Sequence, residues 1–99
     1  MRLTQKQIAT IKATVPEVFG EGVTVCLFGS RLDDHAKGGD IDLLIKSSEI
    51  LDDKVNKAAI LTARLQMRLG DQPIDVLILD PQTVQNAVYS HAMATAVRL

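Results

Sequence analysis

The sequence predicts a small α/β (α+β) domain, in which a mixed sheet of about three strands is flanked by helices in the order αβαβαβα. Three apolar runs indicate the strands, at residues 23–28, 40–45 and 74–79. The segments between and around these runs carry apolar residues at helical spacing. The length of 99 residues fits a single domain that spans 1–99.

The composition excludes several classes of protein. Hydrophobic residues make up 46% of the chain but aromatic residues only 3%, so the core is expected to be aliphatic. A formal net charge of −1 offers no broad basic surface, so we expect no direct nucleic acid binding. No apolar run has the length of a membrane span or a signal sequence. The single cysteine, Cys26, fits a reducing compartment, and we expect a cytoplasmic protein.

The first helix is expected at about residues 4–19. Thr4 can supply its N-cap. Pro16 lies inside the apolar pattern and is expected to distort the helix or end it early. The strand that follows, 23–28, is apolar on both faces towards its end, which favours a central place in the sheet.

The remaining helices are expected to begin at polar residues that follow the second and third strands. Ser47 or Ser48 can cap a long second helix that continues to about residue 69. Asp80 and Pro81 are predicted to be the N-cap and the first helical position of the last helix.

Two acids on the second strand need an explanation beyond packing. Asp40 and Asp42 are two positions apart, so on a strand their side chains share one face, with backbones about 6.6 Å apart. Two charges at that distance repel by about 2–3 kcal/mol at an effective dielectric of 20. A hard divalent cation such as Mg²⁺ would offset the repulsion; the alternative is an edge strand whose acids face water. The intervening apolar residues point the other way, into a core: Ile41, Leu43 and Ile45.

Asp75 interrupts the otherwise apolar third strand. Burying a charge there is costly unless it is paired or bound to a metal. The alternatives are a surface-facing residue or the partner of an arginine.

The Gly29-Ser30 pair directly follows the first strand. Glycine lets backbone N–H groups approach an anion closely, and a helix that began at Ser30 would favour phosphate. A plain turn is the alternative, because glycine and serine are common in turns.

Other polar residues point to no further site. The loop residues Asp33, Asp34 and His35 are expected to be solvated. Cys26 is expected to be inert packing, and His91 to be structural or exposed. Nucleophile-elbow, P-loop and paired-cysteine motifs are absent, so the sequence gives no support to a hydrolase, a P-loop protein or a zinc site.

In combination, the motif Leu27-Phe28-Gly29-Ser30-Arg31, the later Gly39-Asp40-Ile41-Asp42-Leu43 and Asp75 resemble the nucleotidyltransferase superfamily of DNA polymerase beta. The chain looks most like its minimal nucleotidyltransferase (MNT) branch, the small antitoxins that accompany HEPN-domain toxins. The resemblance covers residues 23–79. Gly39 departs from the pattern, because members often have serine before the first acid.

The resemblance implies a nucleotidyltransferase fold and a role for each motif residue. The turn after the first strand would bind the nucleotide, and the acids would be catalytic and would ligate two Mg²⁺ ions, with ATP as substrate. The nucleotide-binding residues would be Gly29, Ser30 and Arg31, and the catalytic and metal-binding residues Asp40, Asp42 and Asp75.

The family also implies a partner. Its members transfer AMP from ATP to a hydroxyl of a HEPN RNase toxin, typically a tyrosine, and thereby neutralise it, which implies a hetero-oligomer with the toxin. In a chain of 99 residues we expect no second domain to present the acceptor, which would agree with a protein substrate. One alternative is a non-catalytic antitoxin that masks its partner by binding; another is a nucleotidyltransferase acting on RNA ends or a small molecule. The alanine-rich end, 92–97, is expected to pack on the sheet or to contact a partner.

Overall fold

The computed structural model describes residues 3–29, 40–84 and 86–99. Within these residues it has the predicted α+β fold, with three helices and one mixed sheet. A helix between the first two strands, which the expected order requires, would fall in residues 30–39, outside the described residues. The elements are α1 (Gln5–Phe19), β1 (Val23–Phe28), β2 (Ile41–Ser47), α2 (Lys54–Leu69), β3 (Ile74–Leu79), α3 (Ala87–Thr95) and β4 (Val97–Arg98).

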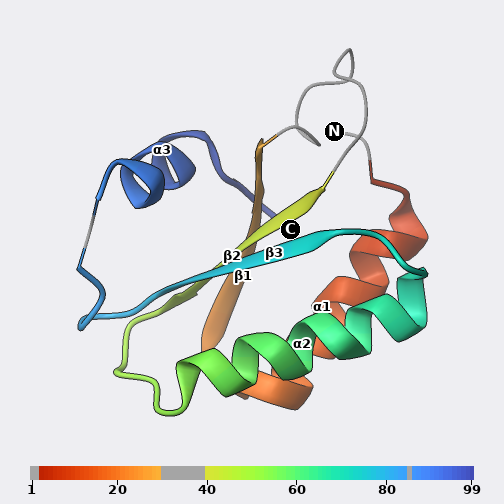
Figure 1. Cartoon of the computed structure of the whole chain (residues 1–99), viewed down its shortest axis with the longest axis horizontal. Helices are drawn as coiled ribbons and strands as arrows, with labels where there is room; N and C mark the ends of the chain where they lie inside the picture. The colour runs from red at the N-terminus through yellow and green to blue at the C-terminus, as the bar shows by residue number, and fades with distance from the viewer. Residues whose placement is uncertain (1–2, 30–39, 85) are drawn as a thin grey trace.

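The sheet has the strand order β3-β2-β1-β4 (Figure 1). β2 pairs antiparallel with β1 and parallel with β3, and β1 pairs antiparallel with the short β4. The central place predicted for the first strand is therefore confirmed. The fourth strand, formed by Val97 and Arg98, extends the three strands expected from the sequence.

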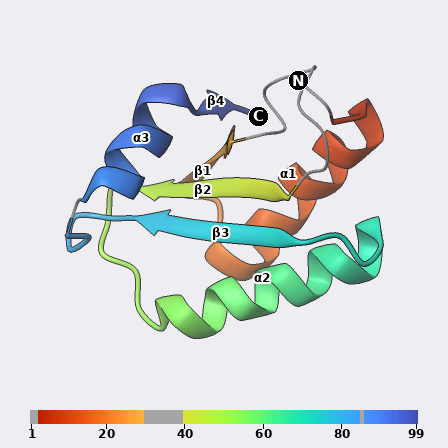
Figure 2. The ribbon, with the colours of Figure 1, turned by 45° about the horizontal axis from the view of Figure 1, so that its top comes forward.

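Helices cover the two faces of the sheet unequally (Figure 2). Alternate residues of β2 fill the core beneath α1 and α2, and Ile41, Leu43 and Ile45 are all fully buried there, as predicted. On the opposite face, Leu44 and Cys26 pack against Ala92 of α3. Within the described residues, every helix falls short of the length and apolar character needed to cross a membrane.

Helix α1 begins as predicted but does not end early. Thr4 and Gln7 form a capping box, in which each side chain accepts a hydrogen bond from the other residue's backbone N–H. Pro16 lies within the helix, which continues to Phe19 and closes with a hydrogen bond from Gly20 N to Pro16 O. The predicted end at about residue 19 is confirmed. Pro16 does not end the helix early, because burial of Val15 and Phe19 outweighs the donor that proline lacks.

Helix α2 begins later than predicted. Neither Ser47 nor Ser48 caps it, since its first residue is Lys54 and its N-cap position is Asp53, with φ +52°. The Ser47 hydroxyl instead bonds locally: it accepts from Glu49 N at 3.1 Å and donates to Glu49 O at 2.7 Å. Serine side chains offer the backbone such turns as an alternative to helix.

Asp80 is not the cap of the last helix, which begins at Ala87 with Asn86 as its N-cap. The side chain of Asp80 is fully buried and joins the end of β3 to the start of α2. It accepts hydrogen bonds from Leu51 N at 2.9 Å and from Lys54 Nζ at 3.0 Å. Further hydrogen bonds come from Gln82 N and the Thr83 hydroxyl, and together with the first two they lower the pKa of Asp80 to about 2.

We predict that Asp80→Ala lowers the Tm by about 10 °C or more, because it removes the acceptor on which two distant backbone segments converge. Thermal unfolding followed by circular dichroism would measure the change. The matched control is Asp52→Ala, which removes an exposed acid paired with Lys57; surface substitutions of this kind change stability little. Equal losses in the two variants would contradict this role for Asp80.

Candidate metal centre

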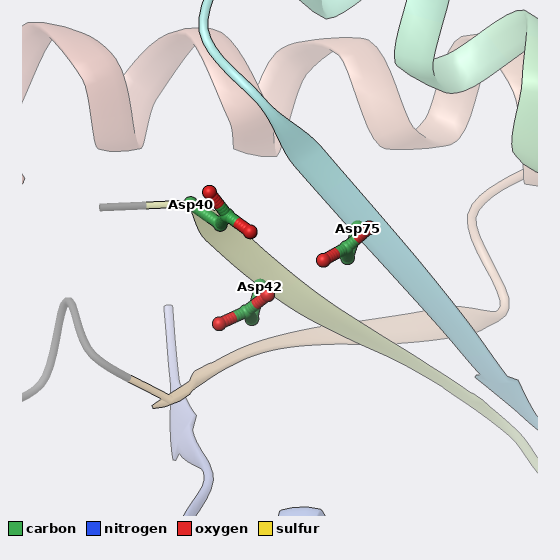
Figure 3. Close-up of side chains that lie close together, drawn as sticks. All are labelled: Asp40, Asp42 and Asp75. Carbon is green, nitrogen blue, oxygen red and sulfur yellow. The ribbon is translucent and has the colours of Figure 1, made fainter. Parts of the chain in front are cut away.

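The three acids singled out in the sequence lie together at one end of the sheet (Figure 3). Asp40 immediately precedes β2, Asp42 lies within β2 and Asp75 within β3. Each offers one carboxylate oxygen, and these oxygens all lie within 4.8 Å of one another. The prediction that Asp40 and Asp42 share a face is confirmed, and the parallel neighbour strand adds Asp75 to the same group.

The register of β2 and β3 explains this convergence. Asp42 is directly paired with Asp75 in the parallel ladder. Because side chains alternate between the two faces of a strand, both acids lie on the face opposite the main core, the face that carries Leu44 and α3. The cost of burying an unpaired acid in the main core is thereby avoided. The alternative placed Asp40 and Asp42 on an edge strand. It is wrong, because β2 lies between β3 and β1 in the sheet.

The position of Asp42 in the cluster raises its pKa. This residue is half-buried, whereas Asp40 and Asp75 are exposed. Burial is the main cause that raises its pKa, to about 6, and the charges of Asp75 and Asp40 raise it further, together with a hydrogen bond to Asp75. The folded protein therefore holds these carboxylates close together although they repel one another.

The donor set fits a hard divalent cation. Three carboxylates converge, and among the described residues no histidine or cysteine, which softer metals prefer, joins the cluster. Carboxylate oxygens suit Mg²⁺, Mn²⁺ and Ca²⁺, and a bound cation would relieve the mutual repulsion. Asp40, Asp42 and Asp75 are thus the residues that could hold a metal.

Of the nucleotide-binding residues predicted from the sequence, the structure describes Gly29. Gly29 directly follows β1, has φ +79° and lies against Asp42. Ser30 and Arg31, and also Asp33, Asp34 and His35, fall outside the described residues. His91 is exposed on α3, and Cys26 is buried in the packing beneath that helix, as expected for a structural residue.

The contact between Gly29 and Asp42 was not predicted from the sequence. The signal for it lies in the antiparallel pairing of β1 and β2, which sets Phe28 opposite Asp42 and so brings the next residue, Gly29, beside the acid.

A comparison with protein-family models and a search of curated proteins both find no match for this chain.

We predict that the metal-free protein becomes less stable as the pH rises through about 6. The pKa of Asp42 is higher in the folded state than its ordinary value of 3.8, so its stabilising contribution is complete below 3.8 and is lost as the carboxyl ionises near 6. Tm measured between pH 4.5 and pH 7.5 would show the decline. Asp42→Asn should flatten that part of the profile; an identical decline in the variant would contradict the assignment to Asp42.

We predict that Mn²⁺ or Mg²⁺ raises the Tm at neutral pH. At a metal concentration about 100 times Kd, preferential binding to the folded state adds about 2.7 kcal/mol, which corresponds to a rise of roughly 10–20 °C in a domain of this size. Differential scanning fluorimetry with wild-type protein, Asp42→Asn and Asp71→Asn would test this. Asp71 is an exposed acid outside the cluster, so its variant should respond to the metal like the wild type. An equal response of Asp42→Asn would place the metal elsewhere.

Proposed function

We propose that this protein is a Mg²⁺-dependent nucleotidyltransferase of the DNA polymerase beta-like superfamily, and that it acts as an MNT antitoxin. In this proposal it transfers AMP from ATP to a hydroxyl, that of a tyrosine, on a HEPN-domain RNase toxin and so neutralises the toxin. The observation that carries the proposal is the convergence of Asp40, Asp42 and Asp75 beside Gly29, the residue that follows β1.

The location of the cluster supports nucleotidyl transfer. The phosphate-binding turn of such a site would begin at Gly29, and Gly29 lies against Asp42. A triphosphate held at that turn would therefore be next to the acids. Asp40 and Asp75 are exposed, so an acceptor as large as a protein side chain can reach the cluster.

The proposed reaction is a displacement at phosphorus. The acceptor oxygen forms a bond to the α-phosphorus of ATP, the bond from that phosphorus to the bridging oxygen breaks, and pyrophosphate leaves. The hydroxyl proton passes to a carboxylate, for which the family resemblance makes Asp75 the candidate, and Asp75 is exposed. Divalent ions held by the acids would neutralise charge on the attacking and leaving oxygens.

A second function is a catalytically silent antitoxin that masks its partner. One observation favours it: exposed apolar side chains gather where β3 and α2 meet the segment before α3. Val55 and Val84 are 88% and 85% exposed, and both line a shallow groove with Val76 and Tyr89. Exposed apolar patches are typical of protein contact sites. A protein that binds its partner through this patch could also modify it. The two functions are therefore distinguished by whether AMP transfer depends on the three acids.

We predict that the protein transfers label from ATP labelled in the α-phosphate to the protein encoded by the neighbouring gene, the proposed HEPN toxin. The transfer should require Mg²⁺ and fall by at least about 100-fold in Asp42→Asn, since a missing metal ligand removes charge stabilisation in the transition state. Gel autoradiography and mass spectrometry of the toxin would measure the transfer and locate the modified residue.

The control is Asp71→Asn, which keeps all three acids of the cluster and should transfer AMP at the wild-type rate. A toxin that stays unlabelled while it forms a stable complex with wild-type protein would favour masking. In that case Asp42→Asn should still neutralise the toxin. Labelled RNA in place of the toxin distinguishes transfer to RNA ends.

A further inference from the structure

Gly29 differs from the other described glycines in what surrounds it. Gly20, Gly29 and Gly70 all have positive φ, at +81°, +79° and +96°. A Cβ added at Gly20 or Gly70 would meet nothing within 4 Å. A Cβ added at Gly29 would overlap the Oδ2 atom of Asp42 and would lie 3.0 Å from its Cγ. Backbone conformation alone therefore explains Gly20 and Gly70, but Gly29 is subject to a second constraint.

We infer that Gly29 is a positioning residue for the metal centre: the missing side chain provides the space in which the Asp42 carboxylate lies. This inference rests on the proposed function, because it gives Gly29 a task at the metal-binding acids in addition to contact with a nucleotide.

The strand arrangement explains why this position is critical. β2 lies between β1 and β3, so Asp42 has Asp75 on one side and the end of β1 on the other (Figure 3). Any side chain at position 29 would compete with the carboxylate for the same volume. Asp42 would have to rotate or its strand would have to shift, and the set of oxygens now within 4.8 Å of one another would be disturbed.

The test compares Gly29→Ala with Gly20→Ala and Gly70→Ala in the full chain, with Mn²⁺ alone as the probe. All three substitutions place alanine at positive φ, so all should lower the Tm. Isothermal titration calorimetry should show Mn²⁺ affinity reduced roughly 10-fold or more in Gly29→Ala only, as expected when a group that orients metal ligands is altered. Wild-type affinity in Gly29→Ala would overturn the inference.

A double-mutant cycle keeps the test decisive if Gly29→Ala is unstable. In a metal-free buffer, the loss in Tm caused by Gly29→Ala should be smaller in an Asp42→Ala background, where the overlapping carboxylate is absent. The loss caused by Gly20→Ala should be the same in both backgrounds. The inference would be overturned if Gly29→Ala lowered the Tm equally in the wild-type and Asp42→Ala backgrounds. It would also be overturned if Gly29→Ala prevented folding in both backgrounds. Because this cycle involves neither ATP nor a toxin, its result is independent of whether AMP transfer occurs.

Discussion

The pairing of β2 with β3 is the interaction on which the site depends. The parallel register places Asp42 directly beside Asp75, and the alternation of side chains along β2 sends Ile41 and Leu43 to the main core on the other face. A slip of one residue would bury the acids under α1 and α2 and expose the apolar residues. The apolar core therefore fixes the position of the acids, and the repulsion between the acids is offset by the burial beneath them.

The pKa values of two aspartates, Asp80 and Asp42, are shifted in opposite directions. Asp80 is fully buried but accepts hydrogen bonds from backbone and side-chain donors, so its pKa is lowered to about 2. Asp42 is half-buried, and this burial, together with the charges of Asp75 and Asp40, raises its pKa to about 6. A buried carboxylate with a structural role, such as Asp80, needs hydrogen-bond donors around it. A carboxylate with a raised pKa among other acids, such as Asp42, is typical of a functional site.

Local signals in the sequence were sufficient for much of the fold and the site. The bounds of β1 and β3 and the shared face of Asp40 and Asp42 followed from apolar runs and strand periodicity. The role of Asp80 could not be predicted, because its partners Leu51 and Lys54 are 29 and 26 residues away. The start of α2 was missed for a related reason: several residues could cap a helix locally, whereas Leu51 and Lys54 near its start are bound by the distant Asp80.

The most direct test of the central claim is a crystal structure of the protein soaked in Mn²⁺, with anomalous scattering used to locate the metal. The account predicts a peak bound by Asp40, Asp42 and Asp75, at about 2–2.6 Å from their carboxylate oxygens. An ordered cluster without a peak at millimolar Mn²⁺ would contradict it, because the three acids would then converge without a metal to bind.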